Sequence, residues 1–102
     1  MKIIKCLSEL IEEELDDACK YVDLAMKWRA DEPDTAELFY QLSLAEMEHM
    51  EKLHKEVTEL IEEYRNENGD PPKEMLTLYE YLHQKHIGRA TEIKVKQGMF
   101  KA

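Results

Sequence analysis

Three side chains in the first half of the chain have the types and spacing suited to holding a metal ion. Glu46 and His49 lie three residues apart, which on an α-helix puts both side chains on one face. Glu14 lies in an earlier helical segment, at a position where the apolar repeat calls for leucine or isoleucine. Carboxylate oxygens with a neutral imidazole match the preferences of Fe²⁺ or Mn²⁺, and Zn²⁺ is a further candidate. Glu14, Glu46 and His49 are therefore the predicted metal ligands and catalytic residues.

These residues interrupt two apolar repeats that step by three and four residues, the spacing of a buried seam in a helix bundle. A buried carboxylate without a partner costs on the order of several kcal/mol. No lysine or arginine occupies either repeat, so a cation is expected. The first repeat is Ile4, Leu7, Ile11, Glu14, Ala18, Tyr21, Ala25 and Trp28, and the second is Phe39, Leu42, Glu46, His49, Leu53, Val57, Leu60 and Tyr64.

The apolar residues of the two helices also allow a second register, in which a different set of side chains forms the buried face. It rotates the buried face by one residue, which moves the charged residues toward the surface. Its members are Leu10, Leu15, Val22 and Leu24 in the first segment and Leu38, Ala45, Met50 and Ile61 in the second. Two further Glu-x-x-His pairs lie off the repeats. We predict that Glu51 and His54 lie at the surface, and that Glu80, His83 and His86 are polar residues at the edge of the third helix rather than ligands.

Helix-breaking residues divide the chain into three long segments. They cluster at residues 31–35 and 66–72, which predicts helices at about 3–30, 35–66 and 72–97. Asp34 or Thr35 is the expected N-cap of the second helix, Gly69 suits the position beyond its end, and Gly98 is expected to end the third. The fold class is therefore all-α, with an antiparallel hairpin and a third C-terminal helix. A hairpin turn near residue 32 brings Glu14 to the height of the Glu46 and His49 pair.

Length and charge restrict the function further. With 102 residues the chain has room for one domain, residues 1–102, and its net charge of -9 disfavours nucleic-acid binding. No apolar run approaches the roughly 20 residues of a membrane span, and the N-terminus has no signal peptide, so a cytoplasmic protein without membrane association is expected. Residues 85–102 instead carry five basic residues against Glu92 alone.

The pattern resembles the first half of a ferritin-like di-iron protein. The resemblance covers about residues 7–64 and lies in Glu14, in Tyr21 seven residues later, and in Glu46-x-x-His49. Rubrerythrins and encapsulated ferritins are the most similar members of that superfamily. A complete site takes a Glu from each of two helices and a Glu-x-x-His from each of the other two. This chain offers one copy of each, so the resemblance implies a homodimer or higher oligomer that closes a four-helix bundle around two iron ions.

The resemblance also implies a chemistry. Glu46 would bridge the irons, Glu14 and His49 would be terminal ligands, and Tyr21 would hydrogen-bond a ligand carboxylate. The expected activity is that of a ferroxidase, the oxidation of Fe²⁺ by O₂ or peroxide, and any storage of iron would need a protein shell. The alternative is a small helical adaptor or phage-type structural protein that keeps the hairpin without catalysis. In that case the basic segment 85–102 would meet an acidic partner.

Overall fold

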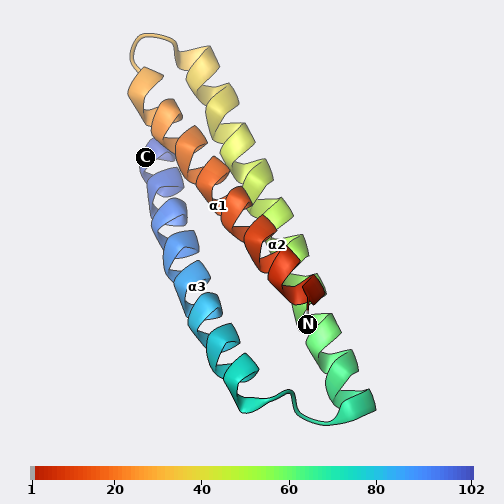
Figure 1. Cartoon of the computed structure of the whole chain (residues 1–102). Coiled ribbons are helices and arrows are strands. Elements are labelled where there is room, and N and C mark those ends of the chain that lie inside the picture. The colour runs from red at the N-terminus through yellow and green to blue at the C-terminus, as the bar shows by residue number, and fades with distance from the viewer. Residues whose placement is uncertain (1) are drawn as a thin grey trace.

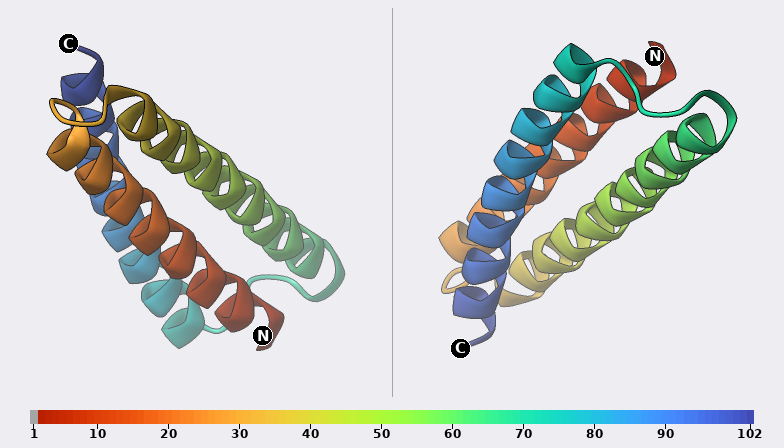
Figure 2. Two further views of the ribbon diagram at one scale, coloured as in Figure 1. Left: turned by 90° about the horizontal axis from the view of Figure 1, so that it is seen from above. Right: turned by 90° about the horizontal axis from the view of Figure 1, so that it is seen from below.

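The computed structural model describes residues 2–102, which form three α-helices joined by two connections. Helix α1 spans Lys2–Trp28, α2 spans Pro33–Asn68 and α3 spans Lys73–Lys101. The first two form an antiparallel hairpin, and α3 runs along α1 in the same direction, so that α1 lies between the others (Figures 1 and 2). The bundle measures 56 × 19 × 17 Å. The predicted all-α hairpin with a third helix is confirmed, while its assembly into a four-helix bundle stays a prediction.

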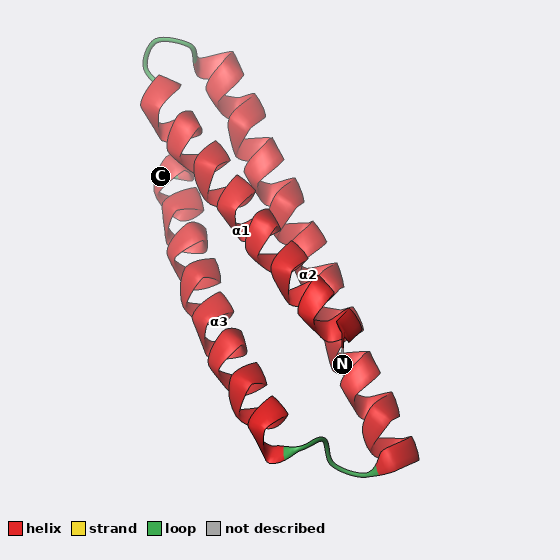
Figure 3. Cartoon of the chain, viewed as in Figure 1, coloured by secondary structure: helices red, strands yellow, loops and turns green. Residues whose placement is uncertain are grey.

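The start of α2 differs from the predicted one. The helix begins at Pro33, directly after the first connection (Figure 3), whereas we expected a cap at Asp34 or Thr35. Glu32 occupies the cap position, and within residues 2–102 no side chain caps this end. The capping prediction is wrong because the Pro33 ring fixes a helical φ and removes an N–H group that would otherwise need a partner.

Glycine ends α2 but does not end α3. Gly69 has a φ of 79°, and its N–H donates to the carbonyl of Arg65 at 2.9 Å, as expected for a glycine beyond a helix end. Helix α3 instead continues through Gly98 to Lys101, so the predicted end is wrong. The last turn is held by tertiary packing, because the buried ring of Phe100 stacks on Tyr40 with centroids 4.9 Å apart.

The buried face of α1 contains members of both registers, so part of it is rotated by one residue from the first repeat. Leu15 and Val22 are fully buried, whereas Tyr21 is half-buried and Trp28 is exposed. The other apolar members of the first repeat are buried as predicted: Ile4, Leu7, Ile11, Ala18 and Ala25. The apolar face of α1 is therefore wide, and Glu14 lies at its edge.

The same rotation applies to α2. Met47 and Met50 are buried in the core, while Glu46 is half-buried and His49 is exposed. The expectation that Glu46 and His49 point into the core is therefore wrong. Because the neighbouring methionines supply a second apolar stripe, the core can form without burying the charged pair.

A buried polar link joins all three helices near the C-terminal end of α3. The Ser43 hydroxyl donates to the carbonyl of Ala18 at 2.7 Å and accepts from the Gln97 side-chain amide at 2.9 Å. Both Ser43 and Gln97 are buried. This link connects α2 to both α1 and α3.

Replacing Ser43 with alanine should destabilise the fold by about 1–3 kcal/mol, because the buried Gln97 amide would lose its partner and the Ala18 carbonyl would lose its second donor. Chemical denaturation followed by circular dichroism would measure the change. Thr58→Ala is the control, since the Thr58 hydroxyl is exposed and bonds to its own helix, at the carbonyl of His54. Equal free energies of unfolding for the two variants would contradict a role for the Ser43 link.

None of the helices in residues 2–102 is long and apolar enough to cross a lipid bilayer.

Candidate metal centre

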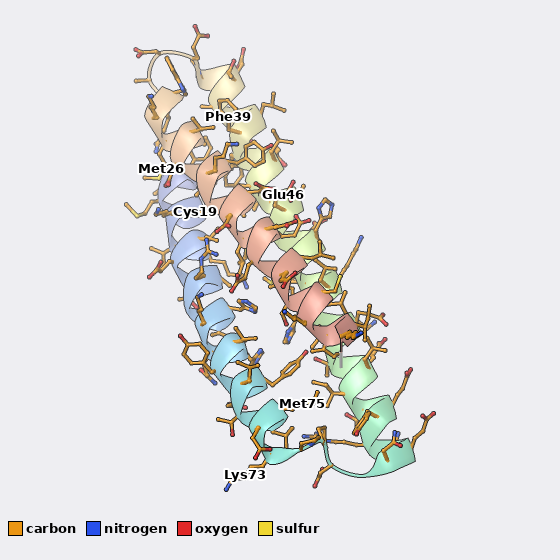
Figure 4. All side chains as sticks on the ribbon, viewed as in Figure 1. Cys19, Met26, Phe39, Glu46, Lys73 and Met75 are labelled. Atoms are coloured by element: carbon orange, nitrogen blue, oxygen red, sulfur yellow. The ribbon has the colours of Figure 1, made fainter. Side chains whose placement is uncertain are left out.

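The three predicted ligands meet at the seam between α1 and α2. The Nδ1 atom of His49 lies 3.4 Å from Glu14 Oε2 and 3.6 Å from Glu46 Oε2. One donor atom from each of the three residues lies within 4.8 Å of the others, close enough to hold a single metal ion. Figure 4 shows Glu46 at this seam, with α3 on the far side of α1. The hairpin brings the three residues together as the sequence predicts.

The cluster lies on the side of the hairpin turned away from α3. On α1, the residues that pair with α3 include Glu12 and Asp16, each two positions from Glu14. Two residues of an α-helix turn by about 200°, so Glu14 points away from that interface. The side chains of Glu14 and Glu46 are 24% and 19% exposed, while that of His49 is 53% exposed. The centre is thus a half-buried site with one open side.

The electrostatics of the centre favour a cation. The neighbouring Glu46 carboxyl is the largest cause of a raised pKa at Glu14, and loss of solvent raises it further, while His49 acts in the opposite direction. Glu14 Oε2 is buried and has no hydrogen-bond partner within residues 2–102. A bound cation would reverse this shift, because it favours the ionised form of both carboxyls. The unpartnered Glu14 oxygen and the neighbouring carboxyls of Glu14 and Glu46 fit a metal ion both in their chemistry and in their positions.

Apolar side chains surround the centre on the same side of the hairpin. We define the outer face as the residues of α1 and α2 that lie on the same side of the hairpin as Glu14, Glu46 and His49. Leu10 and Trp28 are more than one third exposed, and the three leucines of α2 are half-buried. The outer face comprises Ile3, Leu10, Glu14, Tyr21 and Trp28 of α1 with Phe39, Leu42, Glu46, His49, Leu53, Leu60 and Tyr64 of α2.

Tyr21 lies on the outer face two helical turns from Glu14. Its ring stacks on Phe39, with centroids 6.4 Å apart. Within residues 2–102 its hydroxyl makes no hydrogen bond to Glu14 or Glu46. The stack joins α1 to α2 on this face, and the bond of Tyr21 to a ligand carboxylate stays a prediction.

The other histidines lie apart from the centre. His54, predicted at the surface, is half-buried and stacks on His83, with ring centroids 4.7 Å apart. The prediction failed because α3 covers this side of α2. His86 is buried, while Glu51 and Glu80 are exposed. The grouping of His54, His83 and His86 was not predicted from the sequence, although the sequence shows an excess of Glu-x-x-His pairs.

The basic segment of α3 finds acidic partners within the same chain. Arg89 reaches Asp16 at 2.7 Å, and Lys96 reaches Asp23 at 2.9 Å. All five basic residues of segment 85–102 lie within 4 Å of a carboxylate of the hairpin, the other pairs being Lys85 with Glu12, Lys94 with Glu51 and Lys101 with Glu37. The charge of this segment therefore helps to attach α3.

Compared with models of known protein families, with curated proteins and with solved structures, the chain gives no match.

Proposed function

We propose that the protein binds iron through Glu14, Glu46 and His49 and catalyses ferroxidase-type oxidation of Fe²⁺ once two copies share the site. The observation that carries this proposal is the convergence of two carboxylates and an imidazole within 4.8 Å, on a face that α3 leaves open. Glu14 lies on one helix, and Glu46 and His49 lie on the other, 32 and 35 positions later in the chain, so the hairpin itself forms the cluster.

The donor set favours iron and manganese over other ions. Two carboxylates are hard oxygen ligands that suit both oxidation states of iron, and one imidazole adds affinity for transition metals over Mg²⁺. No cysteine contributes, so a structural zinc site of the thiolate type is not supported. Zn²⁺ remains a competitor for the same donors.

A second copy would complete the coordination. One chain supplies three ligand side chains, whereas the paired sites of helix bundles use four carboxylates and two imidazoles. Two hairpins related by a two-fold axis would supply this number and would cover the apolar side chains of the outer face. The half-exposed state of His49 supports this arrangement, because the imidazole has room to meet a partner surface.

The chain's own residues then have separate tasks. Glu14 and Glu46 bind and orient Fe²⁺, and ionise fully when they do so. His49 is neutral when it ligates and therefore adds no charge to the centre. Each bound Fe²⁺ is a substrate that gives one electron to O₂ or peroxide and becomes Fe³⁺. The exposed acid Asp17, three residues after Glu14 on the same helix, would raise the local concentration of Fe²⁺.

The test is an anaerobic titration with Fe²⁺ followed by admission of O₂. A sample in millimolar Mg²⁺ serves as the control, because Mg²⁺ competes for surface carboxylates but weakly for a site that includes imidazole. We expect saturation at about one iron per chain in the presence of Mg²⁺, and the absorbance of ferric iron after oxygen is added.

Size-exclusion chromatography of the same samples tests the shared site. Iron-loaded protein should elute as a dimer or a larger oligomer. Negligible iron in the presence of Mg²⁺ would refute the metal site, and tight binding by a stable monomer would refute its completion by a second copy.

A further inference from the structure

Three of the four histidines gather where α2 faces the N-terminal half of α3, and we call His54, His83 and His86 the imidazole cluster. The rings of His54 and His83 are stacked, with planes 10° apart. His86 is 7% exposed, and within residues 2–102 its Nε2 atom makes no hydrogen bond, although a Glu12 oxygen lies 3.5 Å away. The three side chains line one cavity of about 250 Å³. His54 and His83 also line a second cavity, of about 420 Å³.

The surroundings of the cluster disfavour the charged forms of His54 and His86. Loss of solvent is the main cause that lowers the pKa of His54, and the neighbouring His83 and His86 lower it further. Loss of solvent also lowers the pKa of His86, although Glu12 opposes this effect. Two protonated imidazoles stacked at this distance would repel each other in surroundings that screen charge less than water does.

Charged groups of both signs surround the cluster, so no single counter-charge neutralises it. Glu12 on α1 is shared between His86 and Lys85 of α3, each at 3.5 Å. Glu51 of α2 is paired with Lys94 of α3. The remaining charged groups around the two cavities are Glu62 and Arg65 of α2 and Glu80 of α3.

The two ends of α3 are attached to α2 by different chemistry. At its C-terminal end, Phe100 stacks on Tyr40, Gln97 bonds to Ser43, and Lys101 pairs with Glu37. None of these contacts involves a histidine. At its N-terminal end, the two cavities lie between α2 and α3, and the stacked imidazole pair spans the seam. The contact of α3 with α1 through Arg89 and Asp16 lies outside the cluster, whereas that of His86 with Glu12 is part of it.

We propose that the imidazole cluster is an acid-released latch, which holds the N-terminal half of α3 against α2 when its rings are neutral and lets that half separate when they are protonated. His86 would keep its place against Glu12 when charged, so α3 stays on α1. The C-terminal attachment acts as the hinge. The opening exposes the apolar side chains Val57, Ile61 and Leu76, which line the larger cavity.

The sign of the pH dependence follows from proton binding. An open latch returns His54 to its ordinary pKa of about 6.5, so the open form takes up a proton there first as the pH falls below that value. This proton shifts the equilibrium toward the open form by up to about tenfold per pH unit, until the closed form is protonated as well.

Hydrogen exchange of the metal-free protein in EDTA tests the latch, with rates corrected for the intrinsic effect of pH. Between about pH 7.5 and about pH 5 we expect peptides covering residues 54–62 and 76–84 to lose protection by about tenfold or more. Peptides covering residues 36–47 and 93–101 should keep theirs. Unchanged protection in the peptides covering 54–62 and 76–84, or an equal loss of protection in all four peptides, would overturn the proposal.

Two histidine variants complete the design. His83→Gln removes one ring of the stack and should make the pH response of exchange at residues 54–62 clearly smaller than in the wild type, because the burial of His54 remains while the second ring is gone. His49→Gln, which changes the one histidine outside the cluster, should keep the response of the wild type. A pH response in His83→Gln as large as that of the wild type would overturn the latch. Should His83→Gln fail to fold, His54→Gln removes the other ring and carries the same expectation.

Discussion

Metal-free protein carrying Glu14→Gln should be at least as stable as the wild type at neutral pH, yet should bind Fe²⁺ about 100-fold more weakly. A loss of that size is expected because partners that only support a metal ligand already contribute about 10–100-fold to affinity. Thermal unfolding in EDTA and anaerobic Fe²⁺ titration would measure the two effects on the same preparations.

The stability half of this prediction comes from the raised pKa of Glu14. A carboxyl whose pKa is raised in the folded state gives its full stabilisation below its unfolded value, and loses it as the pH rises through the folded value. At neutral pH the wild type therefore bears the repulsion between Glu14 and Glu46, and glutamine removes it. The advantage of the variant should shrink as the pH falls toward the ordinary carboxyl pKa of about 4.3, because the Glu14 carboxyl of the folded wild type takes up a proton on the way.

Glu13→Gln is the matched control for this experiment. It makes the same change of charge one residue earlier, at an exposed position. We expect Glu13→Gln to bind Fe²⁺ like the wild type. Equal affinities for the two variants would exclude Glu14 as a ligand, and a lower melting temperature for Glu14→Gln would show that the carboxylate has a structural role without metal.

Leu15→Ala should lower the free energy of unfolding by about 2–5 kcal/mol, because it removes a fully buried side chain and leaves a cavity. Domains are stable by only about 5–15 kcal/mol in total, so a large part of the native stability would be lost. Chemical denaturation at low protein concentration would measure it. The result also tests the register of α1, because the first repeat places Glu14 and Ala18, and not Leu15, on the buried face.

Leu10→Ala provides the comparison for Leu15→Ala. Leu10 is 38% exposed on the outer face, so the monomer should lose less than about 1.5 kcal/mol. In the proposed dimer this leucine would be covered, and the cost should therefore grow with protein concentration. Equal costs for the two leucines at low concentration would contradict the observed core.

The meeting of Glu14, Glu46 and His49 was predicted correctly from the sequence, whereas their burial was not. The height of Glu14 relative to Glu46 follows from the length of the hairpin, which the breakers at residues 31–35 determine. Its direction was harder to predict, because Leu15 and Met47 offer an apolar register one residue away. Both registers satisfy the helical period, and only the packing of α1, α2 and α3 together selects between them. Glu14 and Glu46 therefore lie at the edge of the core, still close enough to meet.

The position of α3 could not be read from its sequence. Its apolar residues point in several directions, since Ile93 and Phe100 are buried while Leu78, Tyr81 and Val95 are exposed. Without one apolar face, periodicity does not indicate which side of the hairpin the helix covers. The stacked histidines and the extension of α3 beyond Gly98 depend on that position, so both escaped prediction.

The pairing of α3 with the hairpin has a consequence for how two copies meet. Residues 2–68 hold 19 acidic against 8 basic residues, whereas residues 69–102 hold 4 acidic against 6 basic. Two bare hairpins would repel each other strongly across any shared face. Helix α3 acts as a covalently attached counterion, which neutralises part of that charge from the opposite side. A helix that supplies no ligand would thus lower the electrostatic barrier to joining two half-sites.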